Sequence, residues 1–306
     1  MVPSLALGAD HAFWSDRNGR ILRTPKDGGA TQELRADNGC SIADLAIDEV
    51  GLYALENCRL TEDVPFPVQM RLFRMDPETG DTTDLAIMPY AQGVAVVVHD
   101  GVVYFGMGTP SRTFVRGIPR DGPLEGPEDA FTPYAILGAY GTQLPLATLG
   151  EDVLVVDRST NEVLTLANEP GIDPTSRYVH DRGIRGLADV AGTLFLVDSV
   201  LQNSWYVHRG FRVTSASSLV YDESELDRLV GDSADVYVAG DVDVAPSLTT
   251  RLYSLGANAE AAGAPTAVTA GLRRVTDMAL DASHVFVVDD EISHEVRLVS
   301  VSRVSR

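Results

Sequence analysis

Apolar and polar residues alternate along this chain in short runs, and clusters of Gly, Pro, Asp and Asn separate the runs. Such alternation is the pattern of a half-buried strand, and no segment sustains the period of a helix. Within residues 40–90 the pattern predicts one antiparallel sheet of strands joined by turns. The predicted strands cover residues 42–47, 52–56, 71–75 and 81–86, with tight turns at 48–51 and 77–80.

The pattern of this segment returns seven times. Each copy has a large aromatic or aliphatic anchor, an Ala or Val seven positions earlier, and an apolar residue eight positions earlier. The anchors are 40 to 51 residues apart, which is typical of four-stranded propeller blades. The anchors are Phe13, Tyr53, Tyr104, Leu154, Phe195, Tyr237 and Phe286, the small residues Ala6, Ala46, Val97, Ala147, Ala188, Val230 and Ala279, and the apolar residues before them Leu5, Leu45, Val96, Leu146, Leu187, Leu229 and Met278.

The repeat therefore predicts an all-β fold, a seven-bladed β-propeller of four-stranded antiparallel blades within one domain, residues 1–306. Small residues suit the first strand of a blade, where the sheets converge, and large anchors suit the second strand, where the gap between sheets widens. The last blade is expected to lack its outer strand unless the final residues supply it. The predicted blades cover approximately residues 1–39, 40–90, 91–138, 139–181, 182–224, 225–270 and 271–306.

The first copy reads HAFWSDRNGRI at residues 11–21, followed by KDGG at 26–29. It resembles the YWTD-type repeat of receptor propellers and, more loosely, the NHL and TolB-like repeats. The acid that follows the anchor strand returns as Glu56, Asp157, Asp198 and Asp289. The resemblance implies the propeller fold, a tendency to bind other molecules, and a structural acid that ties one blade to the next. It carries no catalytic residue.

Charge and composition narrow the class of partner. The formal net charge is −20, from 44 acidic and 24 basic residues, which excludes nucleic acid and anionic membranes because both require a basic face. No apolar run approaches the ~20 residues of a membrane-spanning helix, so no membrane insertion is expected. The acidic surface is compatible with cations, with basic proteins or peptides, or with solubility alone. The chain is expected to be a monomer.

Two cysteines indicate the compartment. Cys40 precedes the predicted strand 42–47 and Cys58 follows the predicted strand 52–56, so they face each other across a hairpin. Cross-strand neighbours are close enough for a disulfide, which is favoured over two reduced, buried thiols. A disulfide implies an extracytoplasmic protein, secreted or periplasmic. Because the first residues do not form a signal peptide, the leader is expected to be absent from this sequence.

Candidate binding residues fall on the face where each first strand begins, here called the upper face. The longer connections, at 59–70, 119–143, 168–185, 213–227, 242–250 and 257–274, are all expected there. Phe66, held between two prolines, is a candidate anchor for a partner, and the alternative is that it folds back over its own blade. His180 and His294 are further candidates, with surface roles as the alternative.

The opening positions of the seven first strands are the candidates for an axial site. They are Ser4, Asp44, Ala95, Pro145, Gly186, Arg228 and Asp277. Asp44 and Asp277 offer carboxylate oxygens to a hard cation such as Ca²⁺ or Mg²⁺, and Arg228 could clamp an anion. The alternatives are structural: hydrogen bonding within the fold for the acids, and pairing with acids of neighbouring blades for Arg228.

Two functional hypotheses follow. The favoured one is a non-catalytic binding or scaffold module that uses its upper face and axial mouth for a protein, peptide or small ligand, with no resident cofactor. The alternative is a metal-assisted propeller enzyme of the lactonase or lyase type, with a divalent ion at the axial mouth. The chain contains no G-x-S-x-G, H-E-x-x-H or P-loop motif, which weakens the enzyme hypothesis.

Overall fold

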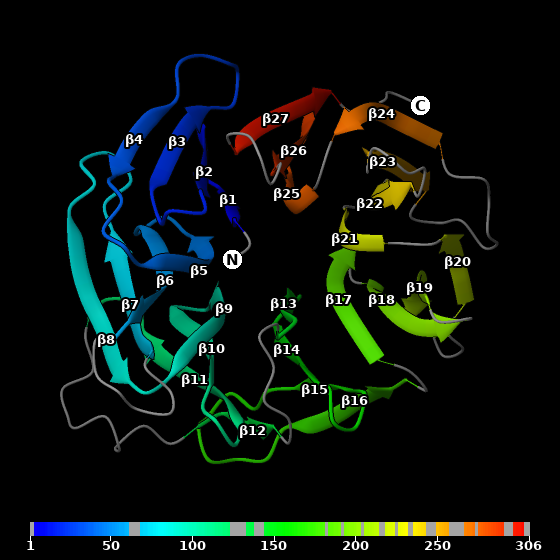
Figure 1. The fold of residues 1–306 in the computed structure, drawn as a ribbon. Coiled ribbons are helices and arrows are strands. Elements are labelled where there is room, and N and C mark those ends of the chain that lie inside the picture. The colour runs from blue at the N-terminus through cyan, green and yellow to red at the C-terminus, as the bar shows by residue number, and fades with distance from the viewer. Residues whose placement is uncertain are drawn as a thin grey trace. The chain divides into compact units, whose positions relative to one another are not determined.

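A computed structural model describes residues 3–60, 68–122, 133–137, 144–180, 183–190, 193–202, 205–213, 218–223, 226–231, 235–242, 249–256, 266–272, 275–290 and 296–302. These residues form strands and turns, without a helix, so the predicted all-β class is confirmed for the described part of the chain (Figure 1). Long apolar helices able to cross a bilayer are also absent from it. The chain divides into two compact units, Met1–Val179 and His180–Arg306.

The first unit contains four sheets, and each is an antiparallel meander of four strands in chain order. Their strands are β1 (Leu5–Leu7), β2 (His11–Ser15), β3 (Ile21–Pro25) and β4 (Gln32–Arg35); β5 (Ser41–Ile47), β6 (Leu52–Arg59), β7 (Val68–Met75) and β8 (Thr82–Pro89); β9 (Gln92–His99), β10 (Val102–Gly108), β11 (Thr113–Pro119) and β12 (Ala135–Leu137); and β13 (Leu146–Leu149), β14 (Asp152–Asp157), β15 (Glu162–Thr165) and β16 (Thr175–Val179).

In the second unit, the described residues form two further four-stranded sheets and one sheet of three strands. Their strands are β17 (Gly183–Val190), β18 (Thr193–Gln202), β19 (Trp205–Val213) and β20 (Ser218–Glu223); β21 (Leu226–Gly231), β22 (Asp235–Val242), β23 (Thr249–Gly256) and β24 (Thr266–Leu272); and β25 (Val275–Leu280), β26 (His284–Asp289) and β27 (Arg297–Ser302). The four-stranded antiparallel blades predicted from the repeat are therefore present in both units.

The sequence repeat has a structural cause. In every sheet, the small residue seven positions before the anchor lies directly opposite the anchor on the neighbouring strand. The spacing of seven is thus the register of the first hairpin of each blade. The paired residues are Ala6 and Phe13, Ala46 and Tyr53, Val97 and Tyr104, Ala147 and Leu154, Ala188 and Phe195, Val230 and Tyr237, and Ala279 and Phe286.

The hydrophobic core lies between successive blades. Phe13 of the first blade packs in one cluster with Leu45 and Phe73 of the second. Tyr53 of the second blade shares the next cluster with Phe105 of the third. In the second unit, a comparable cluster joins β22 and β23 to β25 and β26. Each anchor is at least nine-tenths buried, which confirms that large anchors fill the space between sheets.

The strands of the second blade extend beyond their predicted bounds. β6 continues through Cys58 to Arg59, and β7 begins at Val68 rather than at residue 71. The added residues are polar at Asn57, Arg59 and Gln69 and apolar at Val68 and Met70, and their backbones continue the ladder, as in the pair of Asn57 and Met70. The polar residues interrupt the apolar pattern, so the ends of these strands were missed.

The prediction that all the long connections lie on the upper face was wrong. Four of the predicted ranges contain the outer strand of a blade, namely β12, β16, β20 and β24. Consecutive strands run in opposite directions, so the connection from a third to a fourth strand lies at the lower end of the blade. Only the part that leads onward to the next blade belongs to the upper end.

Candidate functional site

A β-bulge recurs at the upper end of the first strands. In five of the seven sheets, the register slips by one residue just before the position predicted to line the axial mouth. A bulge adds one unpaired residue and redirects the side chains that follow it. The bulged residues are Ala43, Val94, Arg185, Asp227 and Thr276, and the positions after them are Asp44, Ala95, Gly186, Arg228 and Asp277.

Asp44 lies directly after the bulge of β5 and connects three blades. Its Oδ1 accepts hydrogen bonds from the Ser4 hydroxyl at 2.8 Å and from the Leu45 amide at 2.9 Å. Its Oδ2 accepts one from the amide of Val96 in the third blade, at 2.8 Å. Both carboxylate oxygens are therefore engaged by protein donors, which fits the structural alternative better than an open metal ligand.

Asp277 repeats part of this geometry in the second unit. Its Oδ1 accepts a hydrogen bond from the amide of Met278 at 2.9 Å, as that of Asp44 does from Leu45. Arg228 lies in β21 opposite Ala239, at the equivalent register position. Of the other candidates, His180 follows β16 and is 5% exposed, whereas Phe66 and His294 lie outside the described residues.

Replacing Asp44 tests its role as a structural acceptor. We expect Asp44→Ala to lower the free energy of unfolding by about 1–3 kcal/mol, because the amides of Leu45 and Val96 each lose a carboxylate acceptor. Urea unfolding measures the change. Asp121→Ala is the control, because the side chain of Asp121 is 81% exposed. Equal stability of the two variants would contradict the structural role.

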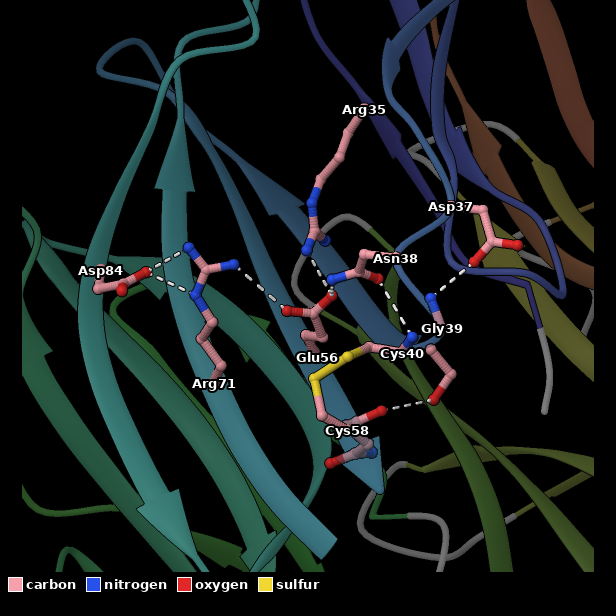
Figure 2. Close-up of a disulfide and its surroundings, with 11 residues drawn as sticks. Arg35, Asp37, Asn38, Gly39, Cys40, Glu56, Cys58, Arg71 and Asp84 are labelled. Atoms are coloured by element: carbon pink, nitrogen blue, oxygen red, sulfur yellow. Dashed lines mark hydrogen bonds and ion pairs between the residues drawn. A yellow bond between two sulfur atoms is a disulfide. The ribbon is translucent and has the colours of Figure 1, made fainter. Parts of the chain in front are cut away.

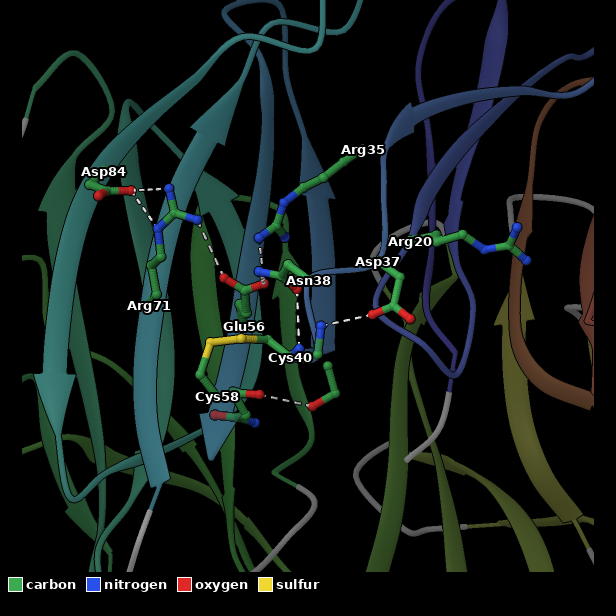
Figure 3. Close-up of polar contacts among 12 residues, drawn as sticks. Arg20, Arg35, Asp37, Asn38, Cys40, Glu56, Cys58, Arg71 and Asp84 are labelled. Atoms are coloured by element: carbon green, nitrogen blue, oxygen red, sulfur yellow. Dashed lines mark hydrogen bonds and ion pairs between the residues drawn. A yellow bond between two sulfur atoms is a disulfide. The ribbon is translucent and has the colours of Figure 1, made fainter. Parts of the chain in front are cut away.

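A second polar cluster lies at the upper end, between the first and second blades (Figure 3). Its centre is Glu56 of β6, whose side chain is 1% exposed. Arg35 of β4 binds Oε1 at 2.5 Å, and Arg71 of β7 approaches Oε2 at 3.4 Å from the other side. Asn38 donates to Oε1 at 3.0 Å. One buried carboxylate thus joins the outer strand of one blade to the next blade.

The two arginines are held in place by further contacts. Arg71 binds Asp84 of β8 through both Nε and Nη2, at 2.6 Å each. Both guanidinium groups lie over the ring of Phe73, 4.7 Å from its centroid. A cation above an aromatic face is attracted by the ring quadrupole. Buried charges are thereby paired on several sides, as burial requires.

The disulfide lies next to this cluster (Figure 2). Cys40 and Cys58 are bonded, with a sequence separation of 18, as predicted. Their sulfur atoms and a carboxylate oxygen of Glu56 lie within 4.8 Å of one another, an arrangement that resembles a metal site. Because both sulfur atoms are bonded to each other in the disulfide, they cannot act as thiolate ligands.

Three other acids of the repeat, Asp16, Asp157 and Asp289, make contacts within their own blades. Asp16 accepts from Arg20 Nε at 2.6 Å and from the amide of Asn18. Asp157 binds Ser159, and Asp289 binds Arg297. Glu56 also accepts a hydrogen bond from Arg35 of the preceding blade, which is the connection between blades that the resemblance predicted. Turn closure, more than the predicted connection between blades, accounts for the acids at Asp16 and Asp157.

At the lower end, a different set of residues joins the blades of the first unit. Arg120, after β11, binds Asp48 at 3.2 Å and also Glu49, both in the turn between β5 and β6. The Arg120 hydrogen bond helps to lower the pKa of Glu49, after a hydrogen bond with the Glu49 backbone. The same turn lies beside the hydroxyl of Tyr53.

Two anchor tyrosines have strongly shifted pKa values. Burial raises the pKa of Tyr53 to about 12, and the Asp48 carboxylate adds to the effect. Burial also raises the pKa of Tyr104 to about 12, with smaller contributions from Tyr134 and Asp100. Tyr104 and Tyr134 meet edge to face, with ring centroids 5.0 Å apart. The folded protein therefore favours the neutral phenols.

These shifts predict alkaline instability. The folded-state pKa lies above the ordinary value of 10.0, so the stabilisation is complete below about pH 10 and is lost as pH rises toward about 12. We expect the free energy of unfolding to fall over this interval, and the fall to be smaller in Tyr53→Phe. Tyr90→Phe is the control, because Tyr90 is 45% exposed. An equally steep fall in all three proteins would contradict the prediction.

Comparison with known proteins supports the fold. No family model and no curated protein matches the sequence. Among solved structures, similarity is seen to virginiamycin B lyase from Staphylococcus aureus, with 11% identity over 94% of this chain and 91% of that one, and a TM-score of 0.64. A Bacteroides uniformis protein assigned as a 6-phosphogluconolactonase has 12% identity over 96% and 95% of the two chains, and a TM-score of 0.61.

A third similar structure is YCF48 bound to D1 peptide, with 9% identity over 98% of this chain and 92% of that one, and a TM-score of 0.63. Identities this low show the fold alone. The fold-level resemblance inferred from the first repeat is confirmed, and the chain has a β-propeller fold.

Proposed function

We propose that this chain is a non-catalytic binding module that holds a positively charged protein or peptide segment at its upper face. The observation that carries this proposal is the environment of Asp44, whose two carboxylate oxygens accept hydrogen bonds from residues of three blades. These bonds give the best candidate metal ligand of the sequence a structural role, which is to hold the blades together. The net charge of −20 supports a cationic partner, because complementary charge steers association.

The proposal includes the architecture and location of the module. The seven sheets of the described residues would form one seven-bladed propeller domain over residues 1–306, acting as a monomer. The solved propellers align over nearly their whole length, which supports one continuous domain. The disulfide between Cys40 and Cys58 supports an oxidising, extracytoplasmic compartment, either periplasmic or secreted.

Phe66, Asp277 and His294 are the proposed contact residues for the positively charged segment, and Arg228 would pair with a carboxylate of the same partner. The similarity to YCF48, which was solved bound to a peptide, supports a peptide-binding role at the level of the fold. Phe66, between Pro65 and Pro67, would be the rigid apolar anchor of the contact. His180, which is 5% exposed, is less suited to direct contact.

The test uses peptides of defined charge. Immobilising the peptides, rather than the protein, leaves the upper face accessible. We expect Arg-rich peptides with one aromatic residue to bind, and the affinity to fall with salt. Phe66→Ala should weaken binding about tenfold. Equal binding of acidic, neutral and basic peptides would refute the proposal.

The similarity to a lyase and an assigned lactonase keeps the metal-assisted enzyme as the second candidate function. Asp44 and Asp277 would then hold a Ca²⁺ or Mg²⁺ ion. A thermal melt after EDTA treatment, with Ca²⁺, Mg²⁺, Mn²⁺ or Zn²⁺ added back singly, separates the two candidates. An ion that binds only the folded state raises the midpoint. A rise with one ion that is lost in Asp277→Asn would favour the enzyme.

A further inference from the structure

The loop between β4 and β5 carries an Asn–Gly pair, Asn38 and Gly39, whose backbone and side-chain atoms are hydrogen-bonded to their neighbours (Figure 2). Both residues are exposed. The Gly39 amide donates to Asp37 Oδ1 at 2.8 Å, and Asn38 Oδ1 accepts from the Cys40 amide at 3.1 Å. Asn38 Nδ2 donates to Glu56 at 3.0 Å. Every polar atom of a ring-closing reaction therefore has a partner.

We propose that Asn38 is a self-modification site, at which the chain deamidates its own side chain. The Gly39 nitrogen attacks Asn38 Cγ, and its proton passes to the Asp37 carboxylate. The new N–Cγ bond closes a five-membered imide, and the Cγ–Nδ2 bond breaks as ammonia leaves with the proton held by Asp37. Water then opens the imide to aspartate or isoaspartate, so one ammonia is lost and one water is gained.

Each contact has a chemical role in this step. A carboxylate on the nucleophilic amide is a positioned general base. The Cys40 amide stabilises negative charge on the amide oxygen as the tetrahedral intermediate forms. Gly39 adopts a φ of +78°, and a Cβ built on it would meet no atom within 4 Å, so the backbone that follows the nucleophilic nitrogen is uncrowded.

The chain contains its own control. Asn18 and Gly19 form the same dipeptide in the turn between β2 and β3. There the Gly19 amide donates to a backbone carbonyl, that of Asp16, at 3.3 Å. Gly19 is buried, and a Cβ built on it would lie 2.1 Å from the Cys40 carbonyl oxygen. This second site has neither the carboxylate on the amide nor the free space.

Modification would alter the cluster around Glu56. The new carboxylate oxygen would replace the amide nitrogen that donates to Glu56 at 3.0 Å. Glu56 would lose a donor and gain a like charge beside a side chain that is 1% exposed. The modification would therefore weaken the connection between the first two blades as the protein ages.

Peptide mapping by mass spectrometry during incubation at neutral pH tests the proposal. In the folded protein we expect Asn38 to deamidate at least about tenfold faster than Asn18, since general-base assistance is worth that much or more. In urea, where both pairs are unstructured, the two rates should be about equal. Asp37→Ala should slow Asn38 about tenfold, whereas Asp27→Ala, another exposed acid of the same blade, should not.

Equal rates at Asn38 and Asn18 in the folded protein would overturn the proposal. So would an unchanged Asn38 rate in Asp37→Ala. Thermal melting of each variant shows whether it is folded. The deamidation rate of Asn38 in the folded parent protein, divided by its rate in urea, needs no substitution and so tests the proposal even if a variant does not fold. Asn38→Asp should also melt below the parent protein, and an unchanged midpoint would contradict the predicted effect on Glu56.

Discussion

Replacing Glu56 with alanine should lower the free energy of unfolding by about 3–5 kcal/mol, the largest single-residue effect expected in this protein. Glu56 is 1% exposed and pairs with Arg35 at 2.5 Å and Arg71 at 3.4 Å. Without it, the guanidinium group of Arg35, whose side chain is 13% exposed, would remain buried without its carboxylate partner. Arg71 would keep Asp84. Urea unfolding of the purified variant measures the loss.

Two controls separate the net stabilisation by the Glu56–Arg35 ion pair from the cost of leaving the Arg35 charge buried without a partner. Glu78→Ala removes an ion pair of Arg23 in which the glutamate is 69% exposed, and should cost less than about 1 kcal/mol. The double substitution of Glu56→Leu with Arg35→Met should recover much of the loss, because apolar replacement of a buried pair is often neutral. A double variant as unstable as Glu56→Ala would contradict this explanation.

Breaking the disulfide should cost about 3 kcal/mol. The bond closes a loop of 18 residues between Cys40 and Cys58, and closing a loop of that length restricts the unfolded chain by roughly this amount. Cys40→Ser with Cys58→Ser should therefore lower the unfolding midpoint in urea while circular dichroism still reports strands. Reduction of the parent protein should give the same midpoint as the double variant.

The double serine variant also tests whether the strands and the core form without the disulfide. The backbone hydrogen bonds of β5 and β6 do not depend on it, since Ser41 and Asn57 are already paired. The prediction fails if the oxidised parent and the double variant unfold at the same urea concentration. A complete loss of structure in the variant would also contradict it, because the hydrophobic clusters between blades contain neither cysteine.

The repeat was predictable because one physical constraint acts at seven places. Ala46 opposite Tyr53 is the same pairing as Ala279 opposite Phe286, so size grading and register leave a period in the sequence. The hairpin disulfide was predictable for the same reason, because hairpin register places Cys40 beside Cys58. The polar strand ends at Asn57 and Gln69 were not predictable, because backbone atoms make the ladder there and the side chains give no apolar pattern.

The candidate site was harder to predict. The bulges at Ala43 and Thr276 share no residue type that would mark them in the sequence. Only the structure shows that they precede Asp44 and Asp277. The Glu56 cluster was missed for a different reason. Arg35, Arg71 and Glu56 come from three strands, and spacing within one strand does not reveal which side chains meet. The acid itself was identified from the repeat, but its partners were not.

The disulfide lies within one blade, so it has a mechanical consequence. The contacts that join neighbouring blades of the first unit are non-covalent, from the Asp44 hydrogen bonds to the Arg120 ion pairs. A chain pulled from its ends can therefore release the blades one after another. The segment that joins the two cysteines, which are 18 residues apart, stays closed until the bond is reduced, so about 60 Å of extended chain cannot lengthen under the pulling force.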